Sequence, residues 1–548
     1  MKLPRTLLVL ACALIILAGA GYLGATALIE SVYAYRSPLH NQPPQTGEVV
    51  GPPLTHRVIM VLIDALRADT ATDVQVMPVL NRLRSQGASA TMHSRPPSYS
   101  EPGYSTLFTG AWPEINDGPA YNLSYEDIPT WTQDNLYLAA HQAGLKTAVS
   151  GYYWFEKLIP QDAVSTGFYT PGDDAAADVA VMNAALPWVK DPSYNFILIH
   201  LDQVDYAGEK EGGPRGPHWN EAAHRTDDDL AAILASLDLT QDTLLICSDH
   251  GQIDAGGHGG QDLVTLKEPF VLVGEGVIPG NYGDIQMVDV APTLAVLLGT
   301  RLPASTQGTA LLDMLKITQP AREKVVAIQQ QQQLRLLAAY QSAIGRPQQA
   351  PLGDVSVKTV QVALEAARQA RVNVERWPRL ILAILLALIP AGWMILRRSK
   401  TVLPMLVGAG LYTLLFHFRY AILDGKTYSI SSVPGPTQLI LYNAITVAIS
   451  LTAAWLLVAL WQKWFRLGPA KVGERTMFLA LTAIYLTALP VLWNFGFYGF
   501  TVTWFLPNFA SNFLALLSQI QILFIALVGL LLAGAAALVS RVTVSKRA

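Results

Sequence analysis

The sequence predicts an α/β domain with a mostly parallel sheet flanked by helices, joined to an α-helical transmembrane bundle. Three observations lead to this fold class. Hydrophobic residues make up 51% of the 548 residues and charged residues only 14%, whereas soluble domains carry roughly 25% charged residues. Long apolar runs occupy the N-terminus and the last third of the chain. Between them, short apolar runs alternate with helical patterns, which is typical of a parallel sheet.

The N-terminal apolar run, residues 6–29, contains no charged residue. It is long enough to cross a bilayer core, which takes about 20 residues. The alternative is a cleaved signal peptide, but the apolar core of such signals is usually about 7–15 residues long. We therefore expect an uncleaved transmembrane anchor over residues 6–29. Residues 30–55, whose second half is rich in Pro, Gly and Gln, are expected to form a linker.

Residues 56–320 are expected to form the α/β domain, outside the cytoplasm. Five short runs rich in β-branched residues predict its strands, and helical patterns separate them. In parallel sheets, ligands bind beyond the carboxyl ends of the strands. Residues 321–376 contain two polar helical stretches, near 322–344 and 355–374, and are expected to form a helical connector. The five predicted strands are His56–Ile63, Lys146–Ser150, Asn195–Leu201, Thr243–Cys247 and Phe270–Val273.

Residues 377–540 contain five further apolar stretches, which predict a five-helix transmembrane region at 379–396, 402–422, 437–461, 477–493 and 512–540. A basic tail follows at 541–548. Lys and Arg gather at alternate ends of these stretches, and such clusters stay in the cytoplasm. We therefore expect six spans, both termini in the cytoplasm and residues 30–376 outside it. The basic residues behind this topology are Lys2, Arg5, Arg397, Arg398, Lys400, Lys463, Arg466, Lys471, Arg475, Arg541, Lys546 and Arg547.

The net charge of −3 hides two regions of opposite sign. Residues 377–548 hold 13 Lys and Arg against 2 Asp and Glu, and residues 1–376 hold 25 against 39. An acidic soluble part excludes nucleic acid as an expected partner, because phosphate backbones are bound by basic surfaces. It is compatible with cation binding. The two cysteines, Cys12 and Cys247, lie in different kinds of apolar run, so we expect no disulfide between them.

Acidic residues follow three of the strand-like runs. Asp64, Asp205 and Asp249 stand at these positions, His250 follows directly, and His258 lies in a Gly-Gly-His-Gly-Gly segment. A single Asp after a strand is usually a turn former or a helix cap. Three such ends with two nearby imidazoles instead indicate a metal site. Carboxylate and imidazole ligands without thiolates suit catalytic Zn²⁺, with Mn²⁺ as the alternative.

A hydroxyl residue, Ser100, stands just ahead of a predicted helix that starts near Pro102. A serine in this position is ordinarily a helix N-cap. The alternative is a role in anion binding, because helix N-termini favour negative charge.

These blocks together resemble the alkaline phosphatase superfamily, in its type I phosphodiesterase/nucleotide pyrophosphatase branch. The resemblance covers about residues 56–315 and implies an alkaline-phosphatase-like sheet. The overall arrangement is also similar to glycosylphosphatidylinositol (GPI) ethanolamine-phosphate transferases, although these have many more C-terminal spans. The matching blocks are Val-Leu-Ile-Asp64, Ser100-x-Pro-Gly with Gly110 and Pro113-Glu114, Asp205-x-x-Gly, Ser248-Asp249-His250-Gly, and His258-Gly.

The resemblance implies two divalent metal ions and a covalent mechanism. One ion would be held by Asp64, Ser100, Asp249 and His250, and the other by Asp205, the residue at 209 and His258. Ser100 would be the nucleophile that accepts the phosphoryl group. Asn122 stands about where relatives place a phosphate-binding Asn, with a gap that differs by one residue, and it is otherwise a turn residue.

Two positions depart from the family's pattern. The nucleophile is usually Thr, and here Ser100 stands in its place, with Ser98 as a competing candidate. The second ion's pattern Asp-x-x-Gly-His ends here in Glu209, which could itself be a ligand. Alternatively, Glu209 is a surface charge and His218 or His224 supplies the imidazole, or the second subsite is impaired.

The sequence thus predicts a membrane-bound, metal-dependent phosphodiesterase or phosphotransferase that acts on a phosphoester outside the membrane. A lipid-linked substrate, as in the transfer of a phosphoethanolamine-type headgroup, is favoured because five extra spans exceed what anchoring needs. An impaired binding module on a membrane scaffold is the alternative. A transporter is disfavoured, since no convincing pair of ionisable groups lies in mid-membrane. These residues do not separate hydrolysis from transfer, nor do they name the acceptor or the metal.

Overall fold

The structure, a computed structural model, describes residues 4–346, 356–397, 401–433 and 435–545. The chain divides into a soluble unit, Tyr33–Val372 with Thr503–Leu506, and a membrane unit made of Met1–Val32, Asn373–Val502 and Pro507–Ala548. Five of the basic residues behind the predicted topology lie outside the described residues, as do Val355, where a connector helix was expected to begin, and the end of the predicted tail. The five are Lys2, Arg398, Lys400, Lys546 and Arg547.

An eight-stranded sheet runs through the soluble unit in the order β4-β3-β5-β1-β6-β7-β2-β8. All pairs are parallel except those of β7, which is antiparallel to both β6 and β2. The predicted fold class, a mostly parallel sheet with flanking helices, is confirmed. The strands are β1 (Arg57–Ile63), β2 (Ala88–His93), β3 (Thr147–Tyr152), β4 (Thr166–Thr170), β5 (Phe196–Leu201), β6 (Asp242–Cys247), β7 (Lys267–Gly274) and β8 (Gly280–Gln286).

The sequence pattern predicted β1, β3, β5, β6 and β7 but not the other three strands. Strands β4 and β8 lie at the two edges of the sheet, where β4 has no buried residue and β8 has one. Strand β2, next to β8, has the sequence Ala-Ser-Ala-Thr-Met-His. Small and polar residues of this kind give no apolar run, although β2 pairs with a strand on each side.

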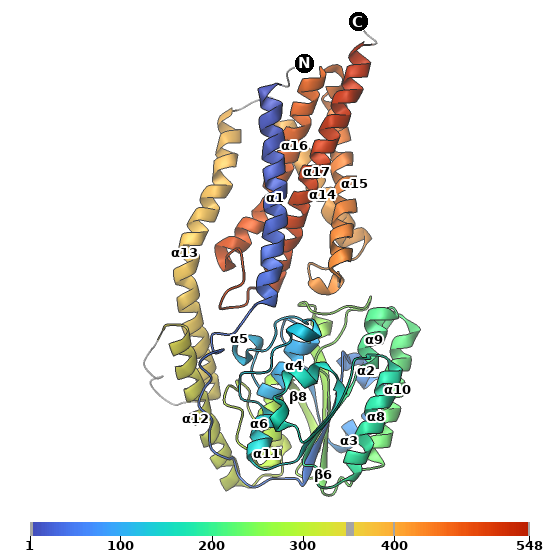
Figure 1. Cartoon of the computed structure of the whole chain (residues 1–548), viewed down its shortest axis with the longest axis vertical. Helices are drawn as coiled ribbons and strands as arrows, with labels where there is room; N and C mark the ends of the chain where they lie inside the picture. The colour runs from blue at the N-terminus through green and yellow to red at the C-terminus, as the bar shows by residue number, and fades with distance from the viewer. Residues whose placement is uncertain (1–3, 347–355, 398–400, 434, 546–548) are drawn as a thin grey trace. The chain divides into compact units, whose positions relative to one another are not determined.

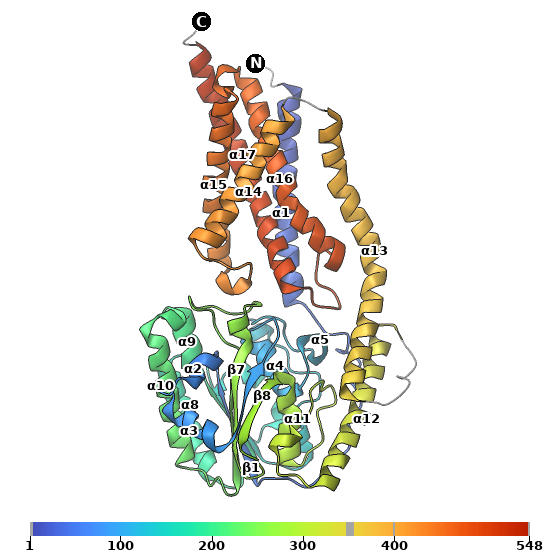
Figure 2. The same ribbon diagram turned by 180° about the vertical axis from the view of Figure 1, so that it is seen from behind.

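The central strands are buried on both faces, as their continuous apolar sequences require. In β1, Val58, Met60 and Leu62 pack into one hydrophobic core, and the residues between them pack into the other. Figures 1 and 2 show the sheet between two layers of helices. One layer holds α2 (Ala68–Thr72), α3 (Pro78–Gln86), α8 (Ala175–Lys190), α9 (Gln203–Lys210) and α10 (Pro217–Leu234), and the other holds α4 (Ser100–Thr109), α6 (Leu136–Gln142), α7 (Trp154–Leu158), α11 (Val290–Leu298) and part of α12 (Gln319–Ala343).

Six helices of the described residues are long and apolar enough to cross a membrane, as the sequence predicted. The chain is an integral membrane protein. One continuous helix, Val357–Arg397, contains both the expected connector helix near 355–374 and the expected span at 379–396. Pro378 and Pro390 lie inside this helix and do not end it. The six are α1 (Arg5–Tyr33), α13 (Val357–Arg397), α14 (Val402–His417) together with the π-helical turn Phe418–Leu423 that continues it, α15 (Pro436–Trp461), α16 (Pro469–Tyr498) and α17 (Phe509–Ser545).

Candidate metal centre and nucleophile

The site is built at the carboxyl ends of three neighbouring parallel strands, β5, β1 and β6. Asp64 follows β1, and Asp249 and His250 follow β6. Strand β5 is followed by Asp202, and Asp205 lies in the first turn of α9. Because parallel strands end at the same edge of a sheet, residues about 185 positions apart in the chain meet here.

The first cluster contains Asp64, Asp249 and His250, whose potential ligand atoms all lie within 4.8 Å of one another. The Nε2 atom of His250 is 3.3 Å from Asp64 Oδ1 and 3.4 Å from Asp249 Oδ2. Among the described residues, neither of these two buried oxygens has a hydrogen-bond partner. Buried carboxylate oxygens are normally paired, so this pair of atoms is suited to a cation.

Ser100 is the first residue of α4. The N-cap residue of this helix is Tyr99, and no side chain caps the helix. Its Oγ lies 3.2 Å from His250 Nε2 and 3.5 Å from Asn122 Nδ2. The backbone N–H of Glu101 donates to Asn122 Oδ1 at 3.1 Å. This bond occupies the amide oxygen of Asn122, so its NH₂ group is the end that faces Ser100.

Ser98 has a different environment from Ser100. Its Oγ bonds the carbonyl of Gly260 at 2.9 Å and accepts from the N–H of Gly259 at 3.0 Å. These contacts tie the segment before α4 to the loop that carries His258. A hydroxyl that is engaged in this way is suited to holding the loop.

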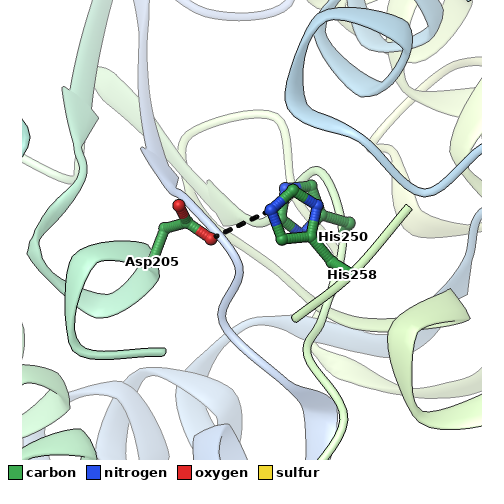
Figure 3. Close-up of side chains that lie close together, drawn as sticks. All are labelled: Asp205, His250 and His258. Atoms are coloured by element: carbon green, nitrogen blue, oxygen red, sulfur yellow. Dashed lines mark ion pairs between the residues drawn. The ribbon is translucent and has the colours of Figure 1, made fainter. Parts of the chain in front are cut away.

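The second cluster contains Asp205, His250 and His258, again with ligand atoms within 4.8 Å of one another. Figure 3 shows the Asp205 carboxylate directed at the two imidazoles, whose ring centres lie 4.2 Å apart in a stacked arrangement. His258 Nε2 is 3.7 Å from Asp205 Oδ1 and 3.1 Å from Glu209 Oε1. Glu209, in α9, thus faces the imidazole of the second cluster.

The two other histidines considered from the sequence lie in other contacts. His218 Nδ1 is 3.0 Å from Glu221 Oε2 on the exposed side of α10. His224 Nδ1 is 2.9 Å from the carbonyl oxygen of Val76. Both residues belong to α10, which packs on α9 and α3.

The two stacked imidazoles differ in charge. Burial lowers the pKa of His258, but the carboxylates of Asp205 and Glu209 outweigh it and raise that pKa to about 9. Burial and the neighbouring charge of His258 lower the pKa of His250 to about 3. Burial and nearby carboxylates raise the pKa of Asp205 and of Asp249 well above the usual range. In the metal-free centre the carboxylates therefore repel one another, and a bound cation would reduce this repulsion.

Two functional candidates, Tyr104 and His200, were missed by sequence reasoning. The hydroxyl of Tyr104 donates to Asp64 Oδ2, and His200 Nε2 lies 3.0 Å from the same oxygen. The N–H of Tyr152 donates to His200 Nδ1 at 3.4 Å, so Nε2 carries the hydrogen. The available signal was a histidine inside an otherwise apolar strand. Asp202 is a further missed residue, since its carboxylate groups with Asp64 and His200.

The donor set fits divalent ions. Two buried carboxylates, the half-buried Asp205, the exposed Glu209 and two imidazoles converge, and no thiolate takes part. Oxygen and imidazole ligands of this kind suit Zn²⁺ or Mn²⁺. Asp64 Oδ2 accepts the hydrogen bonds, and Oδ1 is left to bind an ion. Metal-binding carboxylates are commonly held in this way by hydrogen bonds from neighbouring residues.

Comparison with known proteins finds a family match within the soluble unit. Residues 58–301 match the family described as type I phosphodiesterase/nucleotide pyrophosphatase. The chain is 28% identical over 295 residues to human GPI ethanolamine phosphate transferase 2, catalytic subunit, and 26% identical over 324 residues to human GPI ethanolamine phosphate transferase 3, catalytic subunit. These alignments cover 50% and 52% of this chain but only 29% of each relative. The chain thus spans less than a third of their length.

A solved structure is also similar to part of this chain. Human ectonucleotide pyrophosphatase/phosphodiesterase 5 superposes with a TM-score of 0.40 and 14% sequence identity, over 48% of this chain and 100% of that one. The resemblance to the alkaline phosphatase superfamily that the motifs predicted is confirmed by the family match and the curated relatives.

Proposed function

We propose, on the premise that residues 58–301 form a domain of the alkaline phosphatase superfamily, that this chain is a membrane-bound phosphotransferase. It would be metal-dependent and would move a phosphoethanolamine-type headgroup from a lipid donor to an acceptor hydroxyl through Ser100. The likeness to two ethanolamine phosphate transferases favours transfer over hydrolysis. The same centre would act as a phosphodiesterase if water replaced the acceptor.

The observation that carries the proposal is the position of the Ser100 hydroxyl. It lies 3.2 Å from His250 Nε2, and His250 belongs to both clusters of potential ligands. A serine hydroxyl is a weak nucleophile near neutral pH unless a neighbouring group activates it. Ser98, the competing hydroxyl, is engaged by the His258 loop instead.

The reaction divides into two displacements at phosphorus. In the first, Ser100 Oγ forms a bond to phosphorus, the ester bond to the donor lipid breaks, and the donor leaves as an alcohol that takes up one proton. In the second, the acceptor hydroxyl bonds to phosphorus and Ser100 leaves with its proton restored. Asn122 Nδ2 would donate to a non-bridging phosphate oxygen in both steps, because its amide orientation is already fixed.

The ligand side chains would hold two ions. Asp64, Asp249 and His250 would bind one with Ser100, and Asp205, Glu209 and His258 would bind the other. When bound, such ions stabilise negative charge on the phosphate and on the attacking and leaving oxygens. Glu209 is favoured over His218 and His224 as the third ligand because it alone contacts His258.

The test uses the full chain in detergent with phosphatidylethanolamine labelled in its ethanolamine. Brief incubation should leave phosphoethanolamine on Ser100, detectable by mass spectrometry, and an added glycolipid acceptor should remove it. Ser100→Ala should lose both signals and at least about 10³-fold in rate. Ser98→Ala should keep the label on Ser100. Activity that persists in Ser100→Ala would contradict the nucleophile.

The second subsite is tested by the same assay with added metal. Removal of divalent ions should abolish labelling, and Zn²⁺ or Mn²⁺ should restore it. Glu209→Ala should raise the metal concentration needed for half-maximal activity, whereas Glu209→His should keep it low. If the purified protein binds neither metal, the chain is an impaired binding module. If label is released to water alone at the full rate, the chain is a phosphodiesterase.

A further inference from the structure

Two cavities in the membrane unit lie outside everything that the phosphotransferase chemistry uses. The larger, of about 660 Å³, is lined by the beginning of α1, the beginning of α16, residues 401–405 and Trp393 of α13. The second, of about 410 Å³, lies between α13 and α16 and includes Leu17 of α1. Both volumes are in the range of pockets that bind small molecules, roughly 300–1,000 Å³.

The two cavities meet at one pair of aromatic rings. Trp393 and Phe478 line both of them, and their ring centres lie 5.8 Å apart. Tyr485 lines the second cavity, and its hydroxyl donates to the Ala387 carbonyl at 2.8 Å, which links α16 to α13. The two cavities are therefore neighbours along α13 and α16, with this aromatic pair as their common wall.

The two cavities differ in chemistry. The first cavity is lined by Arg5, Lys471 and Arg475 with a single acid, Glu474. Among the described residues, no ion pair within 4.0 Å links these four side chains, so the opening carries a net charge of two positive. The second cavity is lined almost entirely by apolar side chains, including Leu386, Pro390, Leu481 and Leu492.

We propose that the two cavities together bind an anionic phospholipid, with its phosphate among Arg5, Lys471 and Arg475 and one acyl chain in the cavity between α13 and α16. The charge favours the occupant, because basic pockets between transmembrane helices attract anionic headgroups. The apolar cavity favours a lipid over a free phosphate ion, since only a molecule with a hydrocarbon chain fills both parts. This site is independent of the proposed transfer at Ser100.

The test is lipid retention by the full chain. The protein is reconstituted in nanodiscs of phosphatidylcholine that contain a minority of phosphatidylglycerol, returned to mild detergent, and examined by native mass spectrometry. Wild type should retain one phosphatidylglycerol in preference to phosphatidylcholine. Lys471→Gln/Arg475→Gln should weaken this retention about fivefold for each cation removed. Equal retention of the two lipids would overturn the proposal.

Two controls separate the lipid site from general basicity and from phosphate binding. Lys463→Gln/Arg466→Gln removes two cations of the α15–α16 connection that line neither cavity, and retention should be unchanged. Ala488→Phe fills the apolar cavity with the cations intact, and retention should fall. It also serves as the second variant if the Lys471 and Arg475 change prevents folding. Complete displacement of the lipid by millimolar inorganic phosphate would show an ion site only and overturn the proposal.

Discussion

The orientation of the Asp64 carboxylate depends on two hydrogen bonds that no sequence motif contains. Tyr104 and His200 both bond Oδ2, and Oδ1 remains for an ion. Loss of such a supporting bond typically weakens metal affinity or activity by about 10–100-fold. We therefore expect Tyr104→Phe to bind Mn²⁺ about 10-fold more weakly, with kcat largely restored at saturating metal. Calorimetric titration and the metal dependence of the rate measure the two effects.

Tyr137→Phe is the matched control. Tyr137 is also fully buried, and among the described residues its hydroxyl has no hydrogen-bond partner. Removal of this hydroxyl costs the core little and touches no ligand. Equal losses in metal affinity for the two variants would show that a buried Tyr→Phe change simply loosens the domain, and the positioning role of Tyr104 would fall.

The charge difference between the stacked imidazoles predicts how metal uptake depends on pH. The pKa of His258 is raised to about 9, so its imidazole holds a proton at neutral pH in the metal-free protein. A ligand nitrogen must lose that proton before it binds an ion. Metal uptake at pH 7.5 should thus release at least one proton, and affinity should rise with pH up to about 9 and fall toward pH 6.

Calorimetry in two buffers of different ionisation enthalpy measures the released protons. His93→Gln is the control, because His93 pairs with Asp284 at the sheet edge, 2.8 Å away, and takes no part in either cluster. This variant should release the same number of protons as wild type. Uptake of protons by the wild type on metal binding would contradict the predicted charge of His258.

At the scale of single elements, helix α4 approaches the strand end that carries Asp249 unusually closely. A Cβ atom at Gly103 would lie 2.8 Å from Asp249 Cβ and 2.9 Å from its backbone oxygen. Gly103→Ala gains about 1 kcal/mol of helix propensity, but the clash involves backbone and forces α4 to shift. A misplacement of about 1 Å can cost about 10²-fold in rate. We expect that loss in the labelling assay, together with a lower Tm.

Gly51→Ala provides the comparison for Gly103→Ala. A Cβ at Gly51 would meet no atom within 4 Å, so neither rate nor Tm should change. If Gly103→Ala kept full activity, Ser100 would tolerate a shift of its helix, and a preorganised nucleophile would be untenable.

The elements also show what a sequence reveals about this fold. Central strands and membrane spans are predictable because burial on all sides demands long apolar runs. The ligands at strand ends are predictable because Asp249, His250 and His258 interrupt such runs or stand among glycines. His200 lies inside an apolar strand and Tyr104 inside a fully buried helix, so both resemble core residues. Their contact with Asp64 depends on the register of β1 and β5, which pairs Leu62 with His200 and which no local pattern encodes.

At the scale of the whole molecule, the distribution of basic residues predicts which loops face the cytoplasm. The connection between α15 and α16 carries Lys463 and Arg466, and the start of α16 carries Lys471 and Arg475. Residues 499–508, between α16 and α17, carry no Lys or Arg. Basic loops are retained in the cytoplasm during insertion. The cavity lined by Arg5, Lys471 and Arg475 would then face the inner leaflet. The centre around Ser100 would act on lipids of the outer leaflet.

Cysteine labelling measures this topology directly. A background that carries Cys12→Ala and Cys247→Ala removes the two native thiols. In sealed right-side-out vesicles, a membrane-impermeant maleimide should then label Thr503→Cys, whereas Arg466→Cys should react only after permeabilisation. Both side chains are exposed in the structure, so a lack of reaction reports the membrane and not burial. The reverse pattern would place Ser100 in the cytoplasm, because an even number of candidate spans lies between Ser100 and residue 503 in the sequence. The assignment of an external substrate would then be wrong.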